Sequence, residues 1–289
     1  MALLKRSWIP SLQLLPAAVF LGVFFLVPLA MTFIWGFWPQ TQFWMKPGFT
    51  LEAYQAFVST DRVDVYLKTL RLSLITVVIS LCIGYPVAYY LARKLDEDVA
   101  FSLLFVFVLP FIISTIVRTF SWRFLLGRSG LVNQTLLSLA VINQPLDWLL
   151  FSDIGVLIGL ITASIPFVIF PIWLSLRNID NSLLEASADL GASPFTTFRK
   201  VTLPLSSPGV FAASIFVFVT AFGSTAIPTL LGGGGYSTIG TTLTSVLGVL
   251  NYPLAAAISS ISIATMLVLL GLWMYFFDLD QLVAMGGDH

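Results

Sequence analysis

Long apolar stretches alternate with short charged ones along the whole chain. Charge is absent between Arg6 and Lys46, between Arg71 and Arg93, between Asp98 and Arg118, between Asp153 and Arg177, and between Lys200 and Asp278. A helix that crosses a bilayer needs roughly 20 mainly apolar residues. The pattern therefore predicts membrane-spanning helices near residues 12–37, 68–92, 99–120, 154–176, 207–228 and 254–277.

The last charge-free stretch is too long for one helix, since about 77 residues exceed a single span several-fold. Turn-forming residues occur inside it at Pro228, at the glycine run 232–235 and at the Asn-Tyr-Pro sequence 251–253. Glycine and proline at such places interrupt helices. We therefore expect this stretch to break there and to hold two helices.

A further charge-free stretch, 129–146, carries polar amides at Asn133, Gln134, Asn143 and Gln144. Such groups are costly in lipid when they lack hydrogen-bond partners. We expect an amphipathic or interfacial helix here. If this stretch did cross the membrane, the two ends of the chain would lie on opposite sides.

The composition agrees with a membrane protein. Apolar residues make up 58% of the 289 residues and charged residues 10%, whereas a soluble domain is about a quarter charged. The balance of 14 basic and 14 acidic groups argues against a nucleic-acid binder, which needs a basic surface. One Cys and one His exclude an internal disulfide framework and a His-based metal site. The sequence predicts an all-α polytopic membrane protein, with residues 1–289 as a single domain.

Charge also bears on orientation. Lys5 and Arg6 precede the first apolar stretch, and no basic residue follows it until Lys46. Basic residues favour the cytoplasmic side, so the N-terminus is expected in the cytoplasm. The first stretch is longer than the core of a signal peptide and is expected to remain in the protein. With six spans the 14 basic residues divide evenly between the two sides. The basic residues after the first span therefore do not determine the orientation of the chain.

Sequence patterns of enzyme sites are missing. There is no pair of carboxylates within a span, no Cys/His cluster and no G-x-x-x-x-G-K-[ST] phosphate loop, and the glycine run is followed by Tyr236 instead of Lys. We therefore expect no catalytic residue, no metal site and no bound cofactor in this chain. Any ATP that drives its work must be hydrolysed by another chain.

The polar stretch 178–206 is the most informative part of the sequence. Asn181 or Ser182 can cap a short helix, and Leu184, Ala188 and Gly191 recur at helical spacing. Gly191 can end this helix, and the Ser-Pro pair 193–194 can begin another. The pattern predicts a helix–turn–helix with a small-residue face that can dock into a groove on a partner, although a plain surface loop would also fit.

The motif in this stretch resembles that of a known family. Permease subunits of binding-protein-dependent ABC importers carry E-A-A-x-x-x-G-x9-I-x-L-P in a cytoplasmic loop. The matching residues are Glu185, Ala186, Ser187, Gly191, Val201, Leu203 and Pro204, with Ser187 and Val201 as mild departures. The segments FTLEAY (49–54), GYPVAYYLAR (84–93) and EASADLGAS (185–193) resemble the spermidine/putrescine branch.

The resemblance implies the ABC importer type I permease fold, with residues 178–206 forming cytoplasmic coupling helices against an ATPase subunit. Glu185 would meet a basic group of the ATPase, while small residues would allow close approach. The implied coupling residues are Glu185, Ala186, Ser187, Ala188, Asp189, Gly191 and Pro204.

The same resemblance implies the partners. These are ABC ATPase subunits that bind ATP and Mg²⁺, a second permease that is either an identical or a homologous copy, and a periplasmic solute-binding protein. The loops with Phe49 and Tyr236 would face that binding protein. The chain would lie in the bilayer of the bacterial inner membrane, and no nucleic acid is expected to bind.

Candidates for the substrate pathway rest on side-chain chemistry. Arg118 and Trp122 lie near the outer end of the third predicted span, where an ionisable group is a functional candidate, although snorkelling to the headgroups explains Arg118 equally well. Aromatic rings can stack on a cation, or can simply pack. The aromatic candidates are Tyr85, Tyr89, Trp173 and Phe222. Ser224 is included because the branch often has an acid near this position, and its absence here weakens the argument for a polyamine.

The cargo implied by the resemblance is a polyamine or related amine. Amino-acid derivatives, phosphonates or thiamine are alternatives, because specificity lies largely in the binding protein. An ion-coupled secondary transporter would need interior acids and an inverted repeat. Neither is visible in the sequence.

Overall fold

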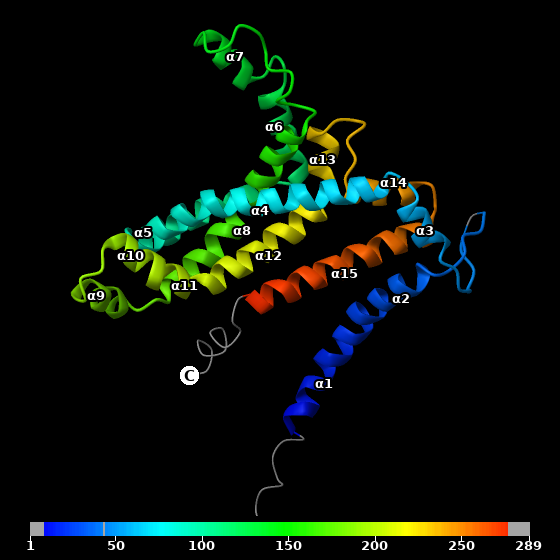
Figure 1. The fold of residues 1–289 in the computed structure, drawn as a ribbon, viewed down its shortest axis with the longest axis horizontal. Helices are drawn as coiled ribbons and strands as arrows, with labels where there is room; N and C mark the ends of the chain where they lie inside the picture. Colours follow the sequence, from blue (N-terminus) through cyan, green and yellow to red (C-terminus); the bar gives the residue numbers. More distant parts are fainter. Residues whose placement is uncertain (1–8, 43, 277–289) are drawn as a thin grey trace, which may run out of the picture. The chain divides into compact units, whose positions relative to one another are not determined.

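The computed structural model describes residues 9–42 and 44–276, with side chains from Leu14 onward. Within these residues the regular structure is helical, apart from an isolated antiparallel bridge between Gln40 and Met45 (Figure 1). Lys5, Arg6, residue 277 of the last predicted span and His289 lie outside the described residues. The all-α class predicted from the sequence is confirmed.

The helices follow one another in a simple order. They are α1 (Ile9–Leu21), the π-helix η1 (Gly22–Leu26), α2 (Val27–Trp35), α3 (Glu52–Val58), α4 (Arg62–Arg93), α5 (Glu97–Ile112), α6 (Thr115–Leu126), α7 (Leu131–Ser138), α8 (Asp153–Arg177), α9 (Asn181–Asp189), α10 (Pro194–Thr197), the π-helix η2 (Phe198–Thr202), α11 (Leu203–Leu205), α12 (Ser207–Phe222), α13 (Ala226–Leu231), α14 (Ile239–Gly248) and α15 (Tyr252–Phe276).

Four of these helical stretches are long and apolar enough to cross a membrane. They are Leu14–Trp35, Arg62–Arg93, Asp153–Arg177 and Tyr252–Tyr275. Two bent pairs, Glu97–Ile112 with Thr115–Ser138 and Pro194–Leu205 with Ser207–Phe222, raise the number to six if each pair forms one span. The sequence predicts about six spans, and the helices match that number if each bent pair forms one span.

The third predicted span, 99–120, is not one helix. α5 ends at Ile112, and α6 begins at Thr115 after a bend of 92°. Ile113 and Ser114 between them leave the helical conformation, and Ser114 occupies the N-cap position of α6 without a side-chain capping hydrogen bond. Apolar residues continue through the bend, so hydropathy does not reveal it. Since a bent pair can still form one crossing, the span itself stays a prediction.

The charge-free stretch after Lys200 holds more helices than the two expected. α12 ends at Phe222, and the chain breaks at 223–225 instead of at Pro228. Pro228 lies in the first turn of α13, where its missing N–H would have no partner inside the helix anyway. The expected break at Pro228 is therefore wrong. The glycine run and residues 249–251 do interrupt helices, and α14 lies between them.

The predicted 129–146 helix is shorter in the structure. α7 covers only Leu131–Ser138. The amide of Asn133 is buried and donates to the carbonyls of Gly127 and Leu146 at 3.1 and 3.4 Å, while its oxygen accepts the Leu146 N–H at 2.7 Å. These bonds satisfy a side chain that would be costly in an apolar setting and fold the following loop back onto α7.

The described chain divides into two compact units, and the expectation of a single permease domain stays a prediction. The first comprises the described part of Met1–Val63 together with Leu243–Thr265. In it the ring of Phe37 stacks on Phe49 with centroids 5.4 Å apart and packs against Tyr54 at 4.9 Å. The second comprises Asp64–Thr242 and the described residues from Met266 onward, and it holds the motif found in the sequence.

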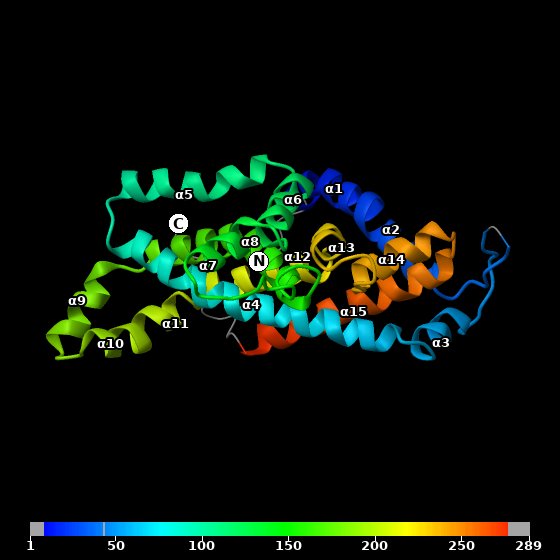
Figure 2. The ribbon, with the colours of Figure 1, turned by 90° about the horizontal axis from the view of Figure 1, so that it is seen from above.

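The second unit is organised along α8. Ser152 caps this helix, since its hydroxyl accepts the Gly155 N–H at 3.2 Å, and the helix runs for 25 residues from Asp153. α12 packs along it, α6 and α13 lie near its beginning, and α9–α11 lie beyond its end (Figures 1 and 2). At 1.5 Å per residue, α8 separates these two ends by roughly 37 Å.

Close packing of α8 on α13 requires a glycine. A Cβ at Gly159 would lie 2.6 Å from Leu231 Cδ1 and 2.7 Å from Ile227 Cγ2. Both partners are buried in one cluster with Val156 and Leu160. The G-x-x-x-G pattern at 155 and 159 therefore serves helix packing.

We expect Gly159→Val to lower the free energy of unfolding by about 1–3 kcal/mol, because overpacking displaces α13 from α8. The denaturation midpoint of the purified protein in detergent measures this change. Gly271→Val is the matched control, since a Cβ at Gly271 would meet no described atom within 4 Å. Equal midpoints for the two variants would contradict the packing argument.

Candidate functional site

The segment from Asp180 to Ser206, which we call the docking segment, has a well-defined beginning. Asp180 caps α9, because its carboxylate accepts the Ser182 N–H at 2.9 Å. This backbone bond holds the pKa of the Asp180 carboxyl below its usual value, so the cap is charged at neutral pH. The expected cap at Asn181 or Ser182 is wrong by one or two residues, and Asn181 instead accepts a hydrogen bond from Arg93.

Gly191 ends α9 as the sequence predicted. Its φ of +77° is left-handed, a conformation that glycine adopts without strain. The N–H groups of Gly191 and Ala192 donate to the carbonyls of Ala188 and Ser187 at 2.8 and 3.1 Å, which is the Schellman pattern of a helix end. Ser193 then caps α10 by accepting the Thr196 N–H at 3.3 Å. The predicted helix–turn–helix is confirmed.

A side-chain hydrogen bond joins the two helices of the docking segment. Ser187 Oγ lies 2.9 Å from Thr197 Oγ1. Ser187 is one of the two residues that depart from the family motif, and an alanine there could not make this bond. The departure is therefore accompanied by an added contact that orients α10 against α9.

Most predicted coupling residues lie on the surface of the docking segment. Ser187 is half-buried, and the exposed members are Glu185, Ala186, Ala188, Asp189, Gly191 and Pro204. Large apolar side chains are exposed beside them, with Leu190 at 88% and Phe195 at 71% exposed. A surface of small, charged and large apolar groups is suited to a protein partner.

Contacts at the ends of α4 and α8 connect the docking segment to the helix bundle. Arg93 at the end of α4 donates to Asn181 Oδ1 at 2.8 Å and to the Ile179 carbonyl at 3.0 Å. Arg177 at the end of α8 forms an ion pair with Glu97 of α5 at 2.6 Å. The docking segment is thus bonded to α4 through Asn181, and α8, which leads into the segment, is bonded to α5.

Two of the pathway candidates lie at this end of the bundle. The hydroxyl of Tyr85 lies 2.8 Å from Ser206 Oγ. The rings of Tyr85 and Tyr89 both pack edge-on against Phe198 of η2, with centroids 5.8 and 5.9 Å apart. These tyrosines connect α4 to the docking segment.

The two pathway candidates on α6, Arg118 and Trp122, lie away from the docking segment. Arg118 donates to the Pro110 carbonyl at 3.1 Å and lies 5.1 Å from the ring centroid of Phe111. Trp122 packs, partly buried, against the cluster at the α8–α13 contact. Arg118 thus contacts the α5–α6 bend, and Trp122 helps to cover the core.

The remaining candidates are packed in the bundle. Trp173 is buried and stacks on Phe170 at 6.3 Å. Phe222 is 1% exposed, with Tyr66 edge-on at 5.7 Å. Ser224 is half-buried, and its N–H donates to the Ala221 carbonyl. The seven pathway candidates are spread along the helices instead of lining one site, and their role in transport stays a prediction.

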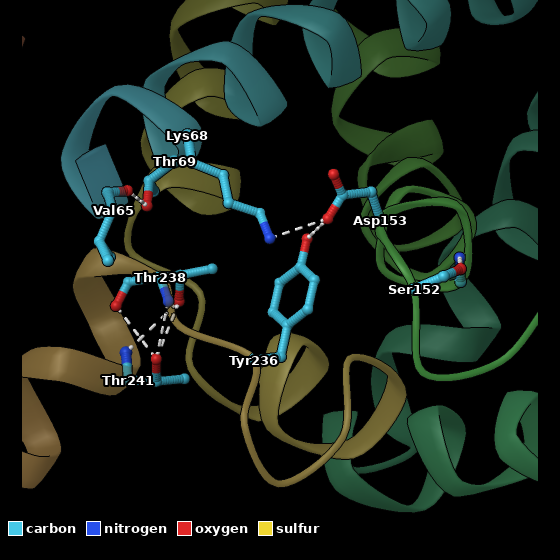
Figure 3. A network of polar contacts seen from close by, with 9 residues as sticks. Val65, Lys68, Thr69, Ser152, Asp153, Tyr236, Thr238 and Thr241 are labelled. Atoms are coloured by element: carbon cyan, nitrogen blue, oxygen red, sulfur yellow. Dashed lines mark hydrogen bonds and ion pairs between the residues drawn. The ribbon is translucent and has the colours of Figure 1, made fainter. Parts of the chain in front are cut away.

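At the opposite end of α8 the structure brings together a polar cluster that the sequence did not predict. Lys68 Nζ lies 3.0 Å from Asp153 Oδ1, and the hydroxyl of Tyr236 donates to the same oxygen at 2.6 Å (Figure 3). Burial and the Asp153 carboxylate raise the pKa of Tyr236, so its hydroxyl stays protonated. Nothing in the sequence pairs these three positions, and Asp153 appeared there only as the border of a charge-free stretch.

The loop that carries Tyr236 is held at two further points. Thr69 Oγ1 accepts the Ile239 N–H at 2.9 Å, and the Phe151 N–H donates to the Leu231 carbonyl at 2.8 Å. α4 and the start of α8 therefore fix the path of residues 232–238. Over the described part of the chain, no group of three or more His, Cys, Asp or Glu side chains could hold a metal ion.

We expect Ser187→Ala to speed amide hydrogen exchange across α9 and α10 by about two- to tenfold, because a hydrogen bond contributes roughly 0.5–1.5 kcal/mol. Exchange followed by mass spectrometry measures this. Adding Thr197→Val should change little further, since its partner is already gone. Unchanged exchange in Ser187→Ala would show that the bond does not stabilise the segment.

Comparison with known proteins supports the motif. The family model for the binding-protein-dependent transport system inner membrane component matches residues 73–279. The spermidine/putrescine transport system permease protein PotB of Escherichia coli K12 is 32% identical over 269 residues, which cover 92% of this chain and 93% of PotB. The inner membrane ABC transporter permease protein YdcU of the same organism is 32% identical over 85% of this chain and 82% of its own length.

Solved structures show the same fold. A chain of the bacterial alginate ABC transporter, in complex with an alginate-bound periplasmic protein, superposes with a TM-score of 0.69 at 16% identity, covering 96% of both chains. A second structure of a bacterial alginate importer gives a TM-score of 0.67. The motif, the family match and the relatives agree: this chain belongs to the family of binding-protein-dependent transport system inner membrane components, the permease subunits of ABC importers.

Proposed function

We propose that this permease carries a polyamine or a related small amine from a periplasmic binding protein into the cytoplasm. Relatives at 32% identity over most of the chain are spermidine/putrescine permeases. The absence of an acid at Ser224 does not weigh heavily against this, because the binding protein selects the cargo before it reaches the permease.

The observation that carries the coupling to an ATPase is the geometry of the docking segment. It presents a short capped helix, a left-handed glycine and exposed apolar side chains, anchored by Arg93 and Tyr85 to α4. In our proposal this surface seats in a cleft of an ABC ATPase, with Glu185 facing a basic group. The ATPase, in a separate subunit, binds ATP and Mg²⁺.

The mechanism we infer is alternating access. Converting a two-state protein from 1:99 to 99:1 requires a ligand that binds one state more tightly by about 5.5 kcal/mol. We propose that ATP-driven closure of the two ATPases supplies this difference through the docking segments of two permeases. The second permease is an identical or a homologous copy, and the cavity between the two turns outward to receive cargo.

The proposed orientation follows from the docking segment. With this segment in the cytoplasm, α8 and α4 place Asp153, Lys68 and residues 232–238 at the outer side. Lys5 and Arg6 before the first apolar stretch independently favour an N-terminus in the cytoplasm. The chain would cross the bacterial inner membrane several times.

Gly191→Asp and Glu185→Lys should each abolish transport while leaving membrane insertion intact. A Cβ at Gly191 meets no described atom within 4 Å, but any side chain at this φ of +77° is strained, Asp less than most. Glu185→Lys carries no such strain, so a defect shared by both variants would arise at the contact with the ATPase. Uptake and binding-protein-stimulated ATP hydrolysis by the reconstituted importer measure it.

Gly248→Asp is the control for these variants, because Gly248 also has open space around it and lies outside both the docking segment and the loop of Tyr236. This control variant should insert into the membrane normally and retain binding-protein-stimulated ATP hydrolysis. Normal uptake by Gly191→Asp or Glu185→Lys would refute the coupling role.

The cargo is tested by the binding profile of the cognate solute-binding protein. We expect tight binding of putrescine or spermidine in calorimetric titrations. A binding protein that takes only an anionic solute would overturn the amine assignment and leave the importer class unchanged.

A further inference from the structure

The cluster at the start of α8 has the form of an ammonium-binding site. Lys68 Nζ lies 3.0 Å from Asp153 Oδ1 and 3.8 Å from the ring centroid of Tyr236 (Figure 3). A carboxylate beside an aromatic face binds an ammonium group by charge-assisted hydrogen bonding and by cation–π attraction. The ammonium of Lys68 therefore occupies a site that would suit any primary amine.

The site is held in place without help from Lys68. The Tyr236 hydroxyl donates to Asp153, and the Tyr236 N–H donates to the Gly233 carbonyl at 3.1 Å. Gly232 packs so closely under Tyr236 that an added Cβ would lie 2.6 Å from Tyr236 Cβ. Removing the lysine ammonium would thus leave the carboxylate and the ring where they are.

Lys68 is weakly held and can be exchanged. The side chains of Lys68 and Asp153 are 37% and 55% exposed. An exposed ion pair contributes about 0–1 kcal/mol, and an exposed cation–π contact about 0.5–1 kcal/mol. The lysine can therefore leave at little cost, and a dissolved amine can reach the carboxylate from solvent.

We propose that Asp153 and Tyr236 form a transit site for a primary ammonium group of the cargo, which takes the place of the Lys68 ammonium. The proposal rests on the amine cargo inferred above and on the position of the site at the end of α8 away from the docking segment. Arg71 also acts electrostatically on Asp153, so two positive side chains remain nearby. Their positive charge keeps the binding of the ammonium group weak, at about millimolar Kd. A transit site must bind weakly, because it has to release its cargo.

The test uses the assembled importer in nanodiscs, with 3-fluorotyrosine in place of Tyr236, and follows the ¹⁹F resonance during titration with putrescine. We expect a saturable shift in the millimolar range. 1,4-Butanediol, which has the same length without charge, and sodium chloride at matched ionic strength should give no such shift.

Variants separate an ammonium site from a structural ion pair. Lys68→Met keeps the aliphatic stem, removes the internal competitor, and should tighten putrescine binding about fivefold, equivalent to roughly 1 kcal/mol. Asp153→Asn should abolish the shift. Asp147→Asn is the matched control, because Asp147 is an exposed acid in an ion pair with Arg128, 3.4 Å away, and it should behave as the unmodified protein.

Two results would overturn the proposal. One is the absence of a saturable shift with putrescine, and the other is unchanged affinity in Lys68→Met; either would leave the cluster as a structural ion pair. If putrescine uptake persists without the shift, only the transit site fails. A binding protein that takes no amine overturns the proposed cargo, and with it the role of this site in transport, whatever the titration shows.

Discussion

The requirement that a membrane-spanning segment satisfy its own backbone hydrogen bonds shapes this protein. A lipid environment offers no partner for a free N–H or C=O, so the crossing segments are helices. α8 shows the consequence most clearly: its 25 residues carry charge only at Asp153 and Arg177. Each charge suits the partial charge of its own helix end, and each takes part in contacts to another element.

The two ends of α8 serve different purposes. At the Arg177 end, Arg93 connects α4 to the docking segment, and the Glu97 ion pair connects α5 to α8. At the Asp153 end, Lys68 and Tyr236 connect α4 to the loop after α13. α8 is one continuous helix between these two polar contact regions, so a displacement at one end can reach the other. In the proposed cycle, ATP would act at one end and cargo would enter at the other.

Local signals in the sequence were sufficient for much of the fold and of the docking segment. Apolar length located the long helices, and Gly191 and Ser193 marked a helix end and a helix start that the structure confirms. Local signals failed where several capping residues stood together, since Asp180 takes the role expected of Asn181 or Ser182. They failed again at Pro228, because a proline in the first turn of a helix gives up no intrahelical hydrogen bond.

The sequence by itself thus determined the membrane class, the long helices and the helix–turn–helix, because hydrophobic length, capping and glycine chirality act within a few residues of the chain. Tertiary structure alone decided that Tyr85 and Tyr89 pack on Phe198 and that Lys68, Asp153 and Tyr236 meet. Those contacts join residues far apart in sequence. The packing of the helices brings these residues together. Gly159 lets α8 approach α13 closely, and Gly232 lets the ring of Tyr236 lie close to the backbone.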